Sequence, residues 1–211
     1  MKEFITIKEN VKTEIVEKKS KFIANLYYIE SVKEAEDLIK EIKKKYHDAR
    51  HNCIAYRVME DERIIEKSSD DGEPSGTAGA PMLAILQKNN LVNVLIIVTR
   101  YFGGILLGTG GLVRAYSNSL LKAIENSEKI EKCIGEELEV IVEYSELESF
   151  KYYCKNNNIN INDIQYSDNI LCKIELDENE KYRLIENFEN KKINIKQIKE
   201  LCKKYITKNI I

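Results

Sequence analysis

Two glycine-rich segments contain most of the residues that could bind or transform a ligand. Residues 70–81 read DDGEPSGTAGAP, and residues 99–114 read TRYFGGILLGTGGLVR. In each segment a polar turn precedes a stretch that is expected to begin a helix. The free N–H groups and the dipole at a helix N-terminus favour an anion. The two segments therefore predict a pair of turns suited to anion binding.

Arginine and aromatic residues accompany these turns. Arg100 ends an apolar segment, and Arg114 falls in the first turn of a predicted helix. A guanidinium binds phosphate or carboxylate through two parallel hydrogen bonds, and Tyr101 and Phe102 could stack on a base or a peptide. The predicted contact residues are Asp71, Gly72, Glu73, Ser75, Gly76, Thr77, Arg100, Tyr101, Phe102, Gly103, Gly104, Gly108, Gly110, Gly111 and Arg114.

Three other interpretations of the same residues stay open, and one of them is a protein-interaction module with a peptide partner. The glycines could serve backbone geometry alone, with Arg114 paired to Asp70, Asp71 or Glu73 as a structural bridge. Alternatively, Asp71 and Glu73 could hold magnesium or act as a base, which would make the chain an enzyme or a binder of a small ligand that contains phosphate.

The sequence lacks the familiar catalytic and metal-binding patterns. It contains neither the Gly-Lys-Ser/Thr triplet of a nucleotide-binding loop nor G-x-G-x-x-G, and Ser75 is not in a G-x-S-x-G turn. His47 and His51 lack the glutamate of an HExxH motif. We therefore predict neither a metal site nor a cofactor. The five cysteines form no CxxC pair and are predicted to be buried thiols: Cys53, Cys133, Cys154, Cys172 and Cys202.

The predicted elements place both segments in an N-terminal domain. Residues 13–18 and 22–29 are predicted strands. Ser31 is predicted to begin a helix, with Ser31 and Glu34 as its capping box. Residues 51–59 alternate as a strand does. Residues 92–100 are the predicted central buried strand, which delivers Arg100 to its end. All nine glycines lie between Gly72 and Gly135. We therefore place the domain boundary near Gly135, which gives domains of residues 1–134 and 135–211.

The second predicted domain has the element order βαββαβ. Its predicted strands cover residues 138–143, 159–166, 170–176 and 193–198, with helices after the first and third strands. This order is typical of a ferredoxin-like sandwich. The predicted fold class is therefore α+β, with two α/β-sandwich domains.

Composition and charge limit the possible partners. Apolar residues make up 43% of the 211 residues, no apolar run approaches the ~18 residues of a membrane span, and no signal peptide is recognisable, so we expect a cytoplasmic protein. Net charge is −2, and residues 1–135 carry 21 Lys and Arg against 20 Asp and Glu. This balance is not that of a strongly basic nucleic-acid-binding domain, so any anion site must be local.

The sequence resembles a known family along residues 15–125. The segments that carry the resemblance are residues 19–23 (KSKFI), 51–57 (HNCIAYR), 71–81 and 93–116. They resemble the YigZ/IMPACT family, and residues from about 135 onward resemble the small βαββαβ domain that bacterial members append.

The resemblance implies a fold and a cellular process. The first domain is expected to share the fold of the second domain of ribosomal protein S-five and of domain IV of elongation factor G. The second domain is expected to resemble the last domain of elongation factor G. Eukaryotic relatives regulate translation by binding the activator of the amino-acid-starvation kinase. We therefore expect a non-enzymatic protein, without a membrane partner, that contacts RNA, the ribosome or a translation factor.

Overall fold

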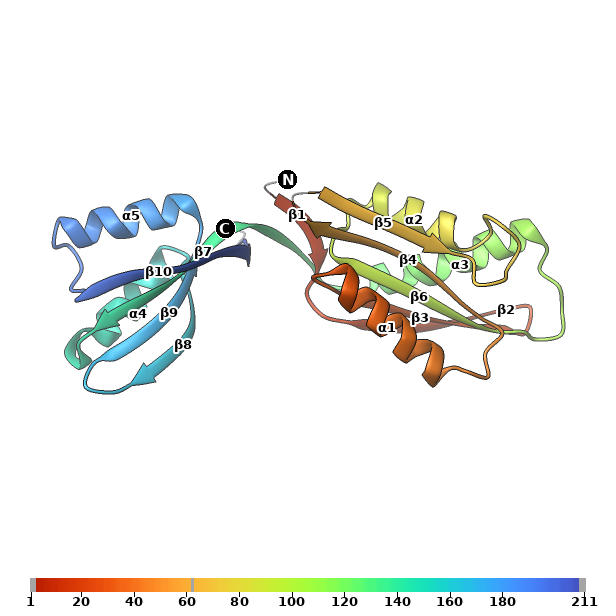
Figure 1. Ribbon diagram of the computed structural model, residues 1–211, viewed down its shortest axis with the longest axis horizontal. Coiled ribbons are helices and arrows are strands. Elements are labelled where there is room, and N and C mark those ends of the chain that lie inside the picture. Colours follow the sequence, from red (N-terminus) through yellow and green to blue (C-terminus); the bar gives the residue numbers. More distant parts are fainter. Residues whose placement is uncertain (1–2, 62, 209–211) are drawn as a thin grey trace. The chain divides into compact units, whose positions relative to one another are not determined.

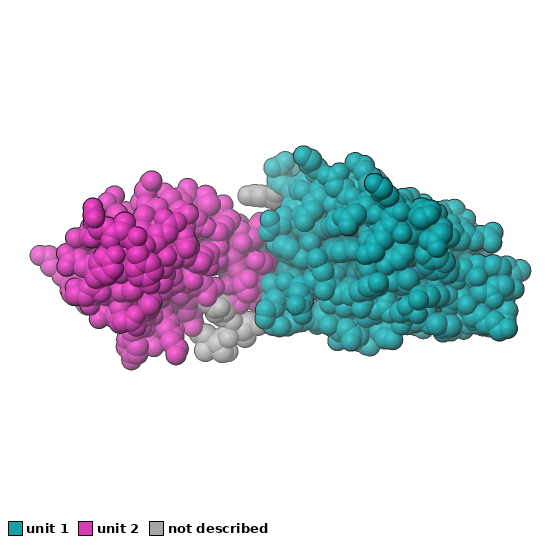
Figure 2. Space-filling view, turned by 90° about the horizontal axis from the view of Figure 1, so that it is seen from below, with its two compact units in different colours: residues 1, 3–130 teal, residues 2, 131–211 magenta. Residues whose placement is uncertain are grey.

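Two separate sheets, each with its own helices and core, make up the fold of this chain (Figure 1). The computed structural model describes residues 3–61 and 63–208. The described residues up to Ile130 form a first unit, and those from Glu131 form a second (Figure 2). The expected boundary at Gly135 falls inside the same strand as this division, β7 (Lys129–Val142). The predicted α+β class is confirmed.

The first unit is built around an antiparallel sheet with the strand order β2-β3-β6-β4-β5. Helix α1 covers one face of this sheet, and helices α2 and α3 cover the other (Figure 1). The elements are β1 (Glu3–Ile7), β2 (Val11–Glu17), β3 (Ser20–Tyr28), α1 (Val32–Lys45), β4 (His51–Glu60), β5 (Arg63–Ser69), α2 (Gly79–Lys88), β6 (Val94–Tyr101) and α3 (Thr109–Glu125).

The beginning of α1 follows from local side-chain chemistry. The Ser31 hydroxyl accepts the N–H of Glu34 at 3.1 Å, as an N-cap residue does. The Glu34 carboxylate accepts the N–H of Glu30 at 2.8 Å instead of that of Ser31. Ser31 therefore caps the helix as predicted, but the reciprocal bond of the predicted capping box is not formed, because Glu34 binds the residue before the cap.

Strand β6 lies in the middle of the sheet and is buried on both faces. Leu95 and Ile97 pack in the α1 core, whereas Ile96 and Val98 pack in the core of α2 and α3. Successive side chains of a strand point to opposite faces. The side chain of Arg100 therefore lies on the sheet face that α2 and α3 cover.

The second unit has the element order predicted from the sequence. Its sheet pairs β10 with β7, β7 with β9, and β9 with β8. An aliphatic core with Phe150 and two cysteines lies on the inner face of this sheet. After β7 come a 3-10 turn (Tyr144–Glu146), α4 (Leu147–Asn156), β8 (Asn160–Tyr166), β9 (Ile170–Leu176), α5 (Glu178–Glu189) and β10 (Gln197–Thr207).

Candidate anion-binding site

The first glycine-rich segment does not leave a helix terminus free for a ligand. One carboxylate oxygen of Asp70 accepts the N–H groups of Ala78 and Gly79 at 2.9 and 2.8 Å, and the other accepts that of Gly76 at 2.8 Å. Burial alone would raise the pKa of Asp70, but these three hydrogen bonds outweigh it and hold the pKa below its usual value. The anion site expected before α2 is thus filled by the protein's own carboxylate.

Asp71 holds the loop in place. Its carboxylate contacts Lys43 Nζ at 2.6 Å and accepts the N–H of Asn52 at 2.6 Å. Its carbonyl oxygen lies 2.8 Å from His51 Nδ1. A carbonyl only accepts, so Nδ1 donates and Nε2 of a neutral His51 is left as an acceptor. Asp71 therefore ties the loop to α1 and β4, and the structure does not present it as a ligand-contacting carboxylate.

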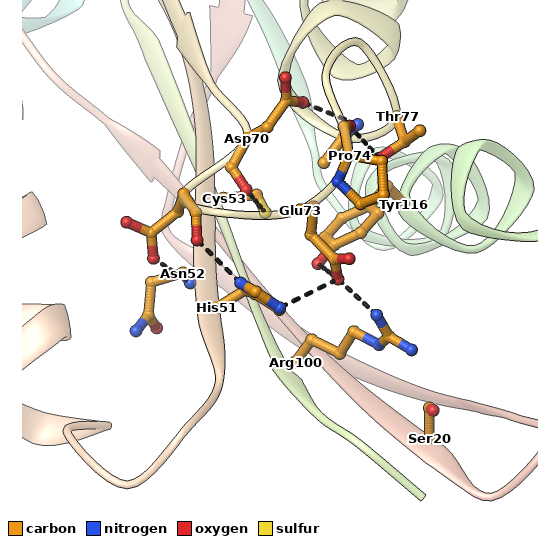
Figure 3. A network of polar contacts seen from close by, with 12 residues as sticks. Ser20, His51, Asn52, Cys53, Asp70, Glu73, Pro74, Thr77, Arg100 and Tyr116 are labelled. Atoms are coloured by element: carbon orange, nitrogen blue, oxygen red, sulfur yellow. Dashed lines mark hydrogen bonds and ion pairs between the residues drawn. The ribbon is translucent and has the colours of Figure 1, made fainter. Parts of the chain in front are cut away.

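Glu73 and Arg100 form a buried ion pair. Arg100 Nη1 lies 2.5 Å from Glu73 Oε1, and the two side chains are 6% and 3% exposed. The Tyr116 hydroxyl donates to the same oxygen at 2.8 Å, and His51 Nε2 lies 3.9 Å from it (Figure 3). Arg100 Nε is buried and finds no acceptor in the described part of the chain. The guanidinium is therefore only partly satisfied by the protein.

Strand register brings these side chains together. Arg100 on β6 is the direct cross-strand partner of Phe22 on β3 and of His51 on β4. The Arg100 guanidinium carbon lies 5.5 Å from the centre of the Phe22 ring. Tyr116 on α3 meets Phe22 edge-to-face, with ring centres 5.2 Å apart. Three neighbouring strands and one helix thus fix the orientation of Arg100.

The second glycine-rich segment does leave a helix terminus free. Gly108 precedes α3 with φ 71°, and no side chain caps the helix. The N–H groups of Thr109, Gly110 and Gly111 meet no acceptor among residues 3–61 and 63–208. A helix of 17 residues therefore directs unpaired N–H groups and the positive end of its dipole outward.

The ion pair and the α3 terminus line a single pocket with a volume of about 540 Å³. Both glycine-rich segments contribute to its wall. The lining residues are Arg50, His51, Gly72, Glu73, Pro74, Arg100, Phe102, Leu106, Leu107, Gly108, Thr109 and Leu112. The Phe102 ring is close to two cations: the Arg50 and Arg100 guanidinium carbons are 5.5 and 5.6 Å from its centre.

Several predicted contact residues lie outside the pocket. Tyr101 points to the α1 face, where its hydroxyl donates to Asp48 at 2.8 Å. The Thr77 hydroxyl donates to the Pro74 carbonyl at 2.6 Å, and Ser75 is exposed. Arg114 is exposed and is not part of the pocket lining; the described residues give it no carboxylate partner.

The remaining predicted glycines have distinct structural roles. A Cβ on Gly103 would lie 2.0 Å from the backbone carbon of Lys19, so this glycine allows the hairpin between β2 and β3 to pack closely. Gly104 has φ 83°, which favours glycine. Gly76 donates its N–H to Asp70. Of the predicted glycines, Gly72 and Gly108 line the pocket, and Gly110 and Gly111 supply unpaired N–H groups.

Sequence reasoning missed Arg50 and the aliphatic wall of Leu106, Leu107 and Leu112. It considered His51 only as a partner of His47 for a metal. No cluster of three or more His, Cys, Asp or Glu side chains within the described residues is placed to hold a metal ion. A usable signal was present in the three consecutive apolar residues between Gly104 and Gly108, which are unusual for a loop.

Known protein families match each of the two units of this chain. The model of the Impact N-terminal domain matches residues 18–124, and a domain of unknown function, DUF1949, matches residues 140–190. IMPACT family member YvyE of Bacillus subtilis is 38% identical over 177 residues, which are 84% of this chain and 81% of that protein. This chain belongs to the IMPACT family.

Other relatives agree with this assignment. An IMPACT family member of Haemophilus influenzae is 39% identical over 165 residues, covering 76% of this chain and 79% of that protein. A crystal structure described as that of a hypothetical protein is 30% identical, covers 92% of this chain and 97% of its own, and superposes with a TM-score of 0.62. No helix of the described residues of this family member is long and apolar enough to cross a membrane.

The charge of the pocket in this IMPACT family member is set by few groups. Arg50 and Arg100 supply two positive charges and Glu73 one negative charge. With a neutral His51 the lining therefore carries a net charge of one positive unit, to which the dipole of α3 adds about half a unit. The pocket is suited to a partner group with a single negative charge.

Proposed function

We propose that this IMPACT family member is a non-enzymatic binding protein in the regulation of translation, which receives an anionic group of RNA, the ribosome or a translation factor in the pocket. One observation carries the proposal: the incompletely satisfied, buried guanidinium of Arg100 and the uncapped N-terminus of α3 line the same pocket. Family membership supports the link to translation, given what the resemblance implies for eukaryotic members. A cytoplasmic location is part of the proposal.

The hydrogen-bond donors of the site lack a full set of acceptors among the described residues. A buried donor without an acceptor costs about 1–3 kcal/mol, and Arg100 Nε is such a donor. The N–H groups of residues 109–111 are further donors that a bound oxyanion would satisfy. An anion in the pocket would accept from these N–H groups and lie beside the Arg100 guanidinium, whose positive charge attracts it.

The surrounding groups favour binding over catalysis. The Asp71 carboxylate is engaged by Lys43 and Asn52, and that of Glu73 by Arg100 and Tyr116. Neither therefore resembles a free base or a magnesium ligand. Burial raises the pKa of the Cys53 thiol to about 12, with Glu73 and Asp71 adding to the effect, so this thiol is a poor nucleophile at neutral pH.

Ribosome co-sedimentation at low salt tests the proposal. Wild-type protein is expected to pellet with ribosomes, and Arg50→Gln to remain largely in the supernatant. Arg63→Gln is the matched control, because Arg63 is exposed and is the cross-strand neighbour of Glu60, at the far end of β4 from His51. Binding should weaken as salt increases, because the charges are partly exposed. Absence of both ribosome co-sedimentation and RNA binding for wild type at low salt would overturn the proposal.

A further inference from the structure

We infer that the pocket receives the free C-terminal carboxylate of a partner polypeptide whose last side chain is aliphatic. This inference rests on the proposed function and narrows it, because it selects a protein partner over RNA. It follows from the charge of the pocket, the geometry of its donors, the chemistry of its walls and the position of its opening.

The charge selects a singly charged group. The ion pair between Arg100 and Glu73 neutralises one of the two arginines, which leaves Arg50 and the α3 terminus as the net attraction. A terminal phosphate monoester would bring close to two negative charges into this site beside the Glu73 carboxylate. A carboxylate brings one, which matches the net charge of the lining.

The donors suit a carboxylate. Backbone N–H groups at a helix start and a guanidinium are the groups that capture chain termini in peptide-recognition sites. Here the N–H groups of Thr109, Gly110 and Gly111 are unpaired. One carboxylate oxygen can accept from these groups while the other accepts from a guanidinium.

The walls suit an aliphatic side chain better than a nucleobase. Leu106, Leu107 and Leu112 line the pocket beside Pro74. Phe102, which is 38% exposed, is the single Phe, Tyr or Trp in the described lining, and two guanidinium groups lie within 5.6 Å of its ring centre. Single-stranded nucleic acids are held by stacking on free aromatic faces. The pocket therefore offers more aliphatic wall than stacking surface, which suits an aliphatic side chain better than a nucleobase.

The opening leaves room for the rest of a polypeptide. Leu106 lines the pocket and is nevertheless 83% exposed, and Ile105 beside it is 42% exposed. These two side chains form an apolar rim outside the charged interior. A chain whose last residue occupied the pocket would cover this rim with its preceding residues, which a free amino-acid-sized acid could not do.

Nuclear magnetic resonance titration of the full-length ¹⁵N-labelled chain tests the inference. The probes are N-acetyl-leucine, N-acetyl-leucinamide, an octapeptide without charged side chains that ends in leucine with a free carboxylate, and a decauridylate. N-acetyl-leucine should shift the amide signals of Thr109, Gly110 and Gly111, and amidation should raise Kd at least about tenfold. The octapeptide should bind more tightly than N-acetyl-leucine, because it also covers the rim.

Variants define where the probes bind. Arg50→Gln should weaken the octapeptide about tenfold by removing the net charge, and Leu106→Ser should weaken it without affecting N-acetyl-leucine to the same extent. Arg63→Gln should change neither. Both pocket positions are exposed, so unchanged thermal melting of each variant confirms that its fold is intact.

Each contrary result has a definite meaning. Equal binding of the acid and the amide would overturn the carboxylate assignment, and so would a decauridylate that shifts the α3 amides when N-acetyl-leucine does not. A bound N-acetyl-leucine with an unbound octapeptide would overturn the polypeptide assignment. In all three cases the proposed function is judged separately, because ribosome co-sedimentation and its loss in Arg50→Gln do not depend on these probes.

Discussion

Arg100 and Glu73 approach to 2.5 Å at the end of β6, and solvent reaches almost none of either side chain. Removing two charges from water is costly, and their attraction compensates only when the geometry is good and the remaining hydrogen bonds are made. Tyr116 supplies one such bond to Glu73, while Arg100 Nε has none from the described residues. The pair therefore holds the guanidinium in position and leaves its Nε without an acceptor among the described residues.

Replacing one member of this pair should be strongly destabilising. Glu73→Gln leaves the Arg100 charge buried without a counter-charge, so the free energy of unfolding should fall by about 3–5 kcal/mol. Urea denaturation at neutral pH measures the loss. Asp37→Asn, which breaks the exposed pair with Lys40, is the control and should cost less than about 1 kcal/mol. Equal losses for the two variants would show that the pair is not buried as described.

Asp70 should make stability depend on pH in the acid range. Its pKa is lowered in the folded protein, since three backbone hydrogen bonds outweigh the effect of burial. Its stabilisation is therefore complete above the unfolded value, about 3.9, and is lost as pH falls through the lower folded value. The free-energy gap between wild type and Asp70→Asn should be clear at pH 7 and smaller at about pH 3. A gap that grows on acidification would contradict the capping role of the carboxylate.

The thiols should differ in reactivity according to burial. Cys53, Cys133, Cys154 and Cys172 are buried as predicted, whereas Cys202 is exposed and the prediction for it is wrong. Burial also raises the pKa values of Cys53 and Cys154 to about 12, so few thiolates form at pH 8. A chromogenic disulfide reagent should therefore label one thiol rapidly in the native chain and all five after denaturation. Rapid native labelling of Cys53 in a Cys202→Ser variant would show that Cys53 is a reactive nucleophile and would contradict its burial.

Two glycines of the same segment should respond to alanine with opposite signs. Gly103→Ala forces a methyl group into the backbone of Lys19 and Ser20, and overpacking of this kind typically costs about 1–3 kcal/mol. Gly110→Ala lies in α3, where the new Cβ would meet only Arg114 Nη1 at 3.8 Å. Because alanine favours a helix by up to about 1 kcal/mol over glycine, this second change should be neutral or stabilising. Urea denaturation of both variants gives the comparison.

Local chemistry could be predicted from the sequence to a large extent. The capping role of Ser31, the buried strand that ends at Arg100 and the βαββαβ order of the second unit each depend on residues close together in the chain. Such features follow from hydrogen bonding and from the periodicity of apolar residues. These local features can be predicted from the sequence because they depend on few contacts between residues far apart in the chain.

The site itself could be predicted only in part. Within the described part of the chain, no side chain caps the glycine-rich turn before α3, whereas Asp70 caps the corresponding turn before α2. The sequence places Asp70 next to this turn but does not show which N–H groups its side chain contacts. Tyr101 and Arg100 are neighbours in sequence and lie on opposite faces of the sheet. Arg50 joins the pocket from a separate segment and belongs to no motif.

By itself the sequence determined the elements, the fold class and the presence of glycine-rich turns before two helices, because these depend on residue types and on short spacings. Tertiary structure alone decided which charges remain available. A carboxylate satisfies whichever donors the folded chain brings within hydrogen-bonding distance, and that choice assigned Asp70 to α2, Asp71 to Lys43 and Glu73 to Arg100. Among the described residues, the groups that these pairings leave unpaired, the N–H groups at the start of α3 and the Arg50 side chain, form the candidate site.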